Sequence, residues 1–163
     1  MVPDSLVKLS LTHFSMFTAK YAMQTLKRVF VPSECKHMIT EEQIECGKKE
    51  VNYSLNEPSF HEHHDCVRIA YEWFDAQAKL GNSTKRTPSL KHKIDKWAGR
   101  YVSTADVELA AHLHPEIHGR YPRFNISTRL TLPSESRLND ISEAFAQERR
   151  YRIDPSIYSV HEQ

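Results

Sequence analysis

Residues 87–132 read TPSLKHKIDKWAGRYVSTADVELAAHLHPEIHGRYPRFNISTRLTL and decide the predicted fold class of this chain. Thr87-Pro88 is a helix start signal, with proline at the first helical position. The helix that follows should bury four apolar residues spaced three or four apart, Leu90, Ile94, Trp97 and Ala98. Ser103 and Asp106 have the spacing of a capping box, which predicts a second helix beginning there. Two helices joined by a tight turn predict a helix-turn-helix.

The third part of this stretch, residues 119–132, lies after the two helices and is rich in Tyr and Arg. Phe124 and Ile126 alternate as in a strand, whereas NISTRL could equally form a short helix capped by Asn125, and the periodicity leaves both open. Its side chains have the chemistry that reaches phosphates and base edges. The predicted nucleic-acid or partner contacts are Lys85, Arg86, Lys91, Lys93, Arg120, Tyr121, Arg123, Asn125 and Arg129.

The rest of the chain predicts further helices. Apolar residues share one side of a helix over residues 12–30, and Thr40 to Gln43 form a capping box for a short helix that should stop at Gly47. Ser59 to Glu62 look like another capping box, for a helix whose apolar stripe is closed by Gly81. After Pro133 one more short helix is expected, followed by a polar tail over residues 147–163.

The fold class predicted from these elements is mainly α with a small β component. A helical N-terminal half, residues 12–80, should pack on a winged-helix-like C-terminal half, residues 87–132, within one globular domain over residues 1–146. Hydrophobic residues make up 39% of the chain and charged residues 26%, as in an ordinary soluble protein, and no apolar run approaches the ~20 residues of a membrane span. The N-terminal residues also lack the pattern of a secretory signal.

Charge is unevenly distributed, although the net charge is only +1. Residues 38–80 contain nine acidic and four basic residues, a balance of −5, while residues 81–137 contain ten basic and five acidic residues, a balance of +5. Such asymmetry is a hint of nucleic-acid contact. Complementary patches within one fold would produce the same pattern.

Three cysteines and a run of histidines raise the question of a metal site. Zinc prefers four thiolate or imidazole ligands, which Cys35, Cys46, His63 and Cys66 could supply as a structural site. The chain has no Cys-x-x-Cys pair, however, and Cys66 falls on the apolar stripe of its helix, where a free cysteine acts as a small hydrophobic residue. The alternative is that the histidines form a solvated helix start and no cofactor binds.

Two enzyme patterns can be compared with the run His61-Glu62-His63-His64-Asp65. A zinc protease helix requires histidine where this chain has Asp65. His64-Asp65, with His37 and Asp106 as further ligands, follows the order of a metal-dependent phosphohydrolase of the HD-domain type, but here the dyad lies at a polar helix start. No glycine-rich phosphate loop or nucleophile motif is present, so binding fits the sequence better than catalysis.

Several segments resemble short, uncharacterised proteins carried by enterobacterial prophages. They are HDCVRIAYEWFDAQAK from His64, KHKIDKWAGRYVSTADVELAAHLHPEIHGRYPRFNISTRL and SRLNDISEAF, which together cover residues 64–145. The resemblance implies a phage or mobile-element origin and a cytoplasmic setting in a bacterial host. It implies no activity and no catalytic residue.

The function predicted is therefore that of a non-enzymatic, phage-related binding protein, namely a DNA-binding regulator that uses the winged-helix-like segment. The alternative is a protein that binds and modulates a host defence or replication factor, since Tyr and Arg are enriched at protein-binding hot spots. A metal-dependent phosphohydrolase or nuclease is the third possibility. Membrane binding is not expected.

Overall fold

The computed structural model describes residues 38–54, 59–83, 90–147 and 153–162 of the 163-residue chain. These residues form α2 (Glu41–Glu50), α3 (His64–Asp75), α4 (Leu90–Ala98) and α5 (Thr104–Leu113), with two short 3₁₀ helices and two small two-stranded sheets. The predicted class, mainly α with a small β component, is confirmed. The helix predicted over residues 12–30 lies outside the described residues.

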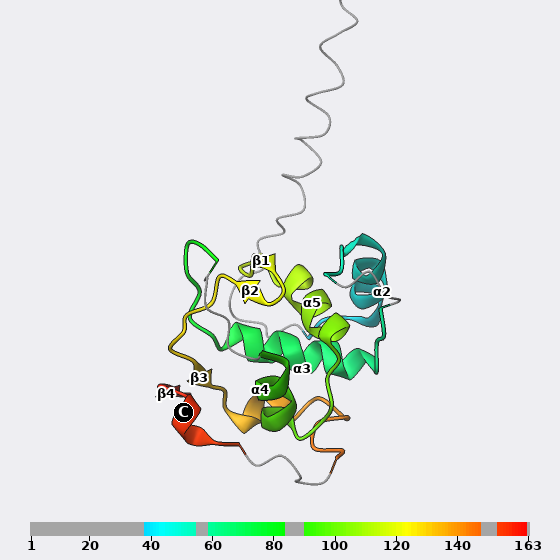
Figure 1. The fold of residues 1–163 in the computed structure, drawn as a ribbon. Helices are drawn as coiled ribbons and strands as arrows, with labels where there is room; N and C mark the ends of the chain where they lie inside the picture. Colours follow the sequence, from blue (N-terminus) through cyan, green and yellow to red (C-terminus); the bar gives the residue numbers. More distant parts are fainter. Residues whose placement is uncertain (1–37, 55–58, 84–89, 148–152, 163) are drawn as a thin grey trace, which may run out of the picture. The chain divides into compact units, whose positions relative to one another are not determined.

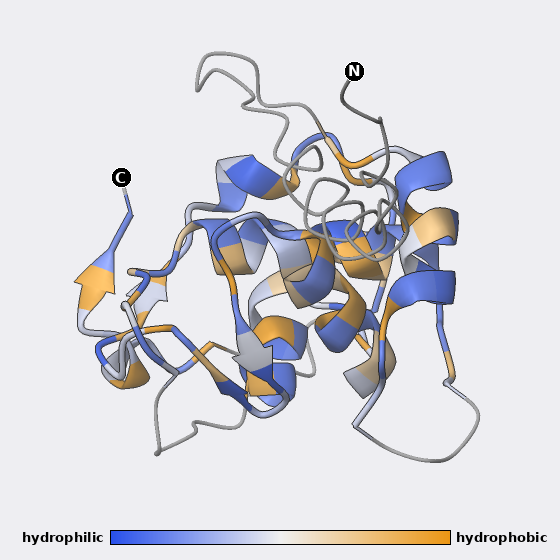
Figure 2. Ribbon diagram, turned by 90° about the horizontal axis from the view of Figure 1, so that it is seen from above, coloured by the Kyte–Doolittle hydropathy of each residue, from blue (hydrophilic) through white to orange (hydrophobic). Residues whose placement is uncertain are grey.

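Helix α3 is the central element. It packs against α2, α4 and α5, and Figure 1 shows it running between α5 and α4. Trp73 and Phe74 on α3 are fully buried, and the Phe74 ring makes an edge contact with Phe124, with the ring centroids 5.3 Å apart. The four apolar residues predicted to face the core from α4 are also buried. In Figure 2 hydrophobic and hydrophilic positions alternate around the helices, as expected for helices that cover one core.

Two of the predicted capping boxes are confirmed. The Thr40 hydroxyl accepts from the Gln43 N–H and the Gln43 side chain accepts from the Thr40 N–H, and Ser103 and Asp106 make the same reciprocal pair. Helix α2 continues to Glu50, past the predicted stop at Gly47. Gly47 is buried against α5, where a Cβ atom would lie 2.9 Å from Leu109. The glycine thus permits close helix packing and does not end the helix.

The predicted limits of α3 are wrong at both ends. The helix begins after His63, whose Nδ1 accepts from the Asp65 N–H, and not after Ser59. It ends at Asp75, before Gly81, because the chain then becomes extended and pairs with a distant segment. The Leu80 N–H donates to the Asn125 carbonyl, and an antiparallel bridge joins Lys79 to Ile126.

The segment with the ambiguous periodicity, residues 119–132, is extended and contains no helix. Strands β1 (Gly119–Arg120) and β2 (Arg123–Phe124) form an antiparallel hairpin, and β3 (Thr131–Leu132) follows. Gly119 has a φ of 115°, and a Cβ atom there would lie 2.3 Å from the Arg123 carbonyl oxygen. The hairpin therefore requires glycine at this position.

The C-terminal residues differ from the prediction. After Pro133 the chain forms the 3₁₀ helix η1 (Glu135–Leu138) and turns, where an α-helix was expected. Residues 153–162, predicted to belong to a polar tail, form a second 3₁₀ helix, η2 (Pro155–Ile157), and β4 (Val160–His161), which pairs in parallel with β3. Tyr158 is buried, so this segment is part of the fold.

No helix in the described ranges is long and apolar enough to cross a membrane.

Candidate functional site

The β1–β2 hairpin presents two arginines side by side. Arg120 and Arg123 are directly opposite each other across the two strands, and both are exposed. Tyr121 and Pro122 connect the strands through a cis peptide bond. Like charges at opposite positions are unfavourable unless an anion lies between or beside them. Within the described residues, neither arginine makes an ion pair, so the hairpin offers an unneutralised pair of cations.

Aromatic contacts anchor the hairpin to the core. Phe124 is buried against Phe74, and the Tyr121 ring makes an edge contact with Phe124, with centroids 6.3 Å apart. Burial raises the pKa of the Tyr121 phenol above its ordinary value, although a hydrogen bond with Thr104 acts in the opposite direction. The phenol is therefore neutral at physiological pH.

Arg120 is held in place by the loop that follows α2. Its Nε donates to Ser54 Oγ at 3.2 Å, and its Nη2 donates to the Tyr53 carbonyl at 3.3 Å. Both bonds are to neutral acceptors, so they orient the guanidinium without cancelling its charge. A guanidinium has five N–H donors. Arg120 thus retains donors for a ligand.

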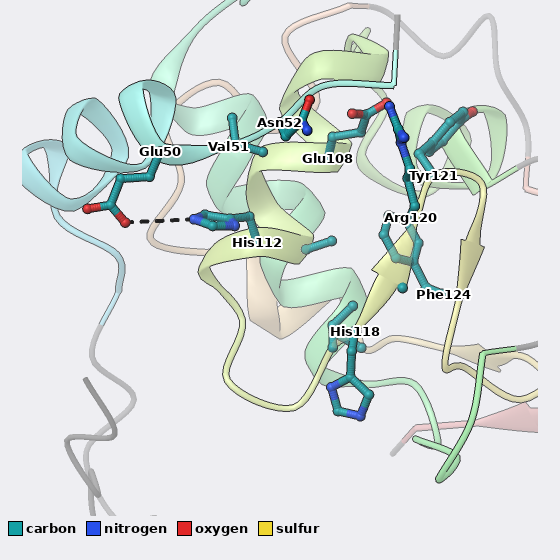
Figure 3. A pocket seen from close by; sticks show the side chains of 12 residues that line it. Glu50, Val51, Asn52, Glu108, His112, His118, Arg120, Tyr121 and Phe124 are labelled. Atoms are coloured by element: carbon teal, nitrogen blue, oxygen red, sulfur yellow. Dashed lines mark ion pairs between the residues drawn. The ribbon is translucent and has the colours of Figure 1, made fainter. Parts of the chain in front are cut away.

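A cleft of about 430 Å³ lies beside the hairpin, between the end of α2 and α5 (Figure 3). Its apolar lining comes from Val51, Ala111, Ile117 and Phe124, and Tyr121 and Arg120 extend the lining onto the hairpin. The polar lining consists of Glu50, Asn52, Glu108, His112 and His118. His112 Nε2 lies 3.9 Å from the Glu50 carboxylate. The cleft combines an apolar surface with polar groups of both charges, as small-molecule and side-chain pockets do.

Glu108 is the polar lining residue with the most unusual environment. It is only 7% exposed, and its Oε2 accepts from the Ser54 N–H at 2.8 Å. Its Oε1 makes no hydrogen bond to any residue that the structure describes. Ser54 therefore joins the two sides of the site, because its N–H binds Glu108 and its hydroxyl accepts from Arg120. A carboxylate acceptor and a guanidinium donor are fixed relative to each other at the edge of the cleft.

A second polar cluster lies along the same loop. The Tyr53 hydroxyl is 2.8 Å from His61 Nε2, and His61 Nδ1 is 2.9 Å from Oδ1 of the fully buried Asp106. Since the carboxylate can only accept, Nδ1 carries a proton, and Nε2 of a neutral ring then accepts from the phenol. Burial, with Asp106 and Glu108 nearby, raises the pKa of Tyr53 to about 12. No local pattern in the sequence predicts this chain of bonds, because Asp106 lies 45 residues after His61.

Two of the lysines predicted to contact a partner, Lys91 and Lys93, interact with neighbouring residues of the fold. Lys91 Nζ lies 3.1 Å from Asp95 Oδ2 and 4.1 Å from the centre of the Tyr101 ring. Lys93 is partly buried, and burial together with the neighbouring Lys96 lowers its pKa. Lys85 and Arg86 lie outside the described residues. Arg129 is exposed and makes no side-chain contact that the structure records in its described part.

Asn125 is placed differently from the other predicted contacts. It is 1% exposed, and its amide nitrogen donates to the Leu80 carbonyl at 3.0 Å and to the Glu116 carbonyl at 2.9 Å. Its amide oxygen accepts from the His118 N–H at 2.7 Å. A base contact would require Asn125 to give up these bonds. Its position identifies it as an internal support of the hairpin.

The three predicted zinc ligands that the structure describes each have another partner. Cys46 is exposed and contacts Glu50, His63 caps α3, and the thiol of Cys66 donates to the Tyr101 carbonyl at 3.4 Å. Burial raises the pKa of Cys66 to about 11, which disfavours the thiolate that zinc requires. Cys35 lies outside the described residues, among which no group of three or more His, Cys, Asp or Glu could hold a metal ion.

The His64-Asp65 dyad is also divided between separate partners. His64 Nε2 lies 2.8 Å from Glu45 Oε1, whereas the buried Asp65 pairs with Arg68 at 2.6 Å and accepts from the Ser142 hydroxyl at 2.7 Å. Asp106, a proposed further ligand, binds His61, and His37 is not among the described residues. The described members of the predicted phosphohydrolase set thus have structural partners in separate places.

Comparison with known proteins found no match to any family model, any curated protein or any solved structure. The resemblance to prophage proteins remains a prediction from the sequence segments that carry it.

Proposed function

We propose that this protein binds DNA as a regulator and contacts the phosphate backbone through the β1–β2 hairpin. The observation that carries the proposal is the exposed cross-strand pair of Arg120 and Arg123, which lacks a carboxylate partner within the described residues. Exposed arginines suit phosphate oxygens, which accept two N–H groups of one guanidinium at once.

The hairpin would be the wing of a winged-helix-like half. Residues Asp106 to Ala111 of α5 are buried, so this helix has little surface to place in a DNA groove. The exposed His92 and Lys96 and the partly buried Lys93, all on α4, could add phosphate contacts. Recognition would therefore rest on the hairpin, with α5 as its internal support.

A gel-shift experiment at increasing salt concentration tests the proposal with both duplex and single-stranded DNA. Arg123→Ala should weaken binding and reduce the slope of log affinity against log salt by about 1, because one phosphate contact is lost. Lys49→Ala is the matched control, since Lys49 is an exposed cation on α2 that forms no ion pair with any residue in the described part of the chain. Arg120→Ala is less informative, because it also removes the bonds to the loop after α2.

The absence of binding to any DNA at low salt would refute the proposal.

One observation supports a protein partner as the second candidate. The cleft has an apolar surface flanked by Glu50 and Glu108, which suits a basic side chain of another protein. That candidate predicts binding to a basic peptide that Glu108→Gln weakens and that Arg123→Ala leaves unchanged or strengthens.

A further inference from the structure

We infer that the cleft beside the hairpin holds an unpaired nucleobase, so that the protein prefers single-stranded over duplex DNA. This inference rests on the proposed function and names its substrate class. It depends on the cleft and Glu108, whereas the proposed function depends on Arg123.

The size and lining of the cleft suit a base. A volume of about 430 Å³ falls within the range of about 300–1,000 Å³ that small-molecule sites occupy. Tyr121 supplies an aromatic ring, and Ala111 and Ile117 supply apolar surface. Stacking on aromatic and apolar side chains is the usual way in which unpaired bases are held.

Glu108 supplies the hydrogen-bond recognition. Its side chain lines the cleft and is more than nine-tenths buried, yet Oε1 has no hydrogen-bond partner among the described residues. Oε1 is not one of the fully enclosed polar atoms that lack a partner in the described residues, so it is accessible from the cleft and can accept directly from a ligand donor. The exocyclic amino group of cytosine is such a donor. Thymine presents carbonyl oxygens on either side of its single N–H, and these repel a carboxylate.

Arg120 connects the cleft to the phosphate contacts. It lines the cleft and also belongs to the hairpin, where Arg123 stands opposite. Ser54 holds Arg120 and Glu108 on its hydroxyl and N–H respectively. A nucleotide whose base donates to Glu108 would thus have its phosphate within reach of the arginine pair. The exposed arginines would bind the phosphate of a nucleotide, and the buried Glu108 side chain would bind its base.

Single-stranded DNA should be preferred because a base must enter the cleft to reach Glu108. In a duplex the amino group of cytosine is already paired and the base is stacked, so entry into the cleft would require unstacking and unpairing. An unpaired nucleotide avoids that cost. Duplex DNA would still bind through Arg123, but without the base contact.

Fluorescence anisotropy with short labelled oligonucleotides tests the inference. Oligo-dC should bind about tenfold more tightly than oligo-dT, and more tightly than a duplex of the same length. Glu108→Gln should remove most of this tenfold difference, because an amide presents one donor and one acceptor in place of two acceptors. Glu42→Gln, which makes the same change at an exposed site on α2, should leave it intact.

A second measurement needs no variant. Excess cytidine monophosphate should displace oligo-dC from the unmodified protein more effectively than uridine monophosphate does. The inference is overturned if dC and dT bind equally, if duplex binds as tightly as single strand, or if folded Glu108→Gln protein discriminates normally. If duplex binding remains sensitive to salt and to Arg123→Ala in those cases, the proposed function stands alone. If no nucleic acid binds, both proposals fail.

Discussion

Asn125→Ala separates a structural role of this residue from a role in binding. Asn125 donates to the Leu80 and Glu116 carbonyls and accepts from the His118 N–H, and it is almost fully buried. Each net hydrogen bond contributes about 0.5–1.5 kcal/mol, so three of them correspond to about 3 kcal/mol. For a chain of this size that loss lowers the melting temperature by about 6–12 °C.

Urea unfolding followed by circular dichroism measures this change. Asn82→Ala is the matched control, because Asn82 is exposed and makes no recorded side-chain contact in the described part of the chain. It should change the free energy of unfolding by less than about 0.5 kcal/mol. If Asn125→Ala were as stable as Asn82→Ala and yet bound DNA less tightly, Asn125 would act in binding and not as an internal support.

Three further predictions concern other parts of the molecule. Arg137→Ala should cost about 2 kcal/mol of stability in urea unfolding, because its guanidinium binds Glu162, Glu72 and Asp75 at distances of 2.6–2.9 Å; no change would show that these pairs are dispensable. Tyr53 should keep its proton up to a pKa of about 12 in the folded protein, against about 10 when unfolded, so the stability it contributes is present below pH 10 and is lost as pH rises towards 12. The difference in tyrosinate absorbance between the unmodified protein and Tyr53→Phe should rise near pH 12, and a difference that rises near pH 10 would contradict the prediction. In a Cys35→Ser background, Cys46 should react rapidly with a thiol reagent and Cys66 only on unfolding, since Cys66 is fully buried; two equally fast thiols would contradict its burial.

Local signals in the sequence predicted local structure well. Thr40 with Gln43, and Ser103 with Asp106, specify helix starts because both partners of each capping box lie within one turn. The apolar spacing from Cys66 to Phe74 and around Trp97 likewise identified residues that are fully or almost fully buried, whereas Ala78 and Leu80, predicted to lie on the same stripe, are exposed. In these cases, the information needed is contained in a few neighbouring residues.

Errors arose where a distant segment competes for the same groups. Ser59 to Glu62 have capping-box spacing, but the Glu62 N–H lies near Asp106 and the helix begins only after His63. Asn125 was predicted to contact a partner because its type suits base recognition, whereas its bonds extend to residues up to 45 positions away. No local pattern marks Glu108 as a site residue, because only the fold places it beside Ser54 and Arg120.

The parallel pairing of β3 with β4 has a consequence for the order of folding. It joins Thr131 to Val160, and the contacts of Arg137 with Glu162 close the same long stretch of chain. Helices α2 to α5 can pack around α3 before residues 153–162 dock, because the contacts among these helices do not involve that segment. Contacts between distant residues require a loop to close before they give any stabilisation. The β4 segment should therefore dock last, and until it does, Tyr158 leaves part of the core uncovered.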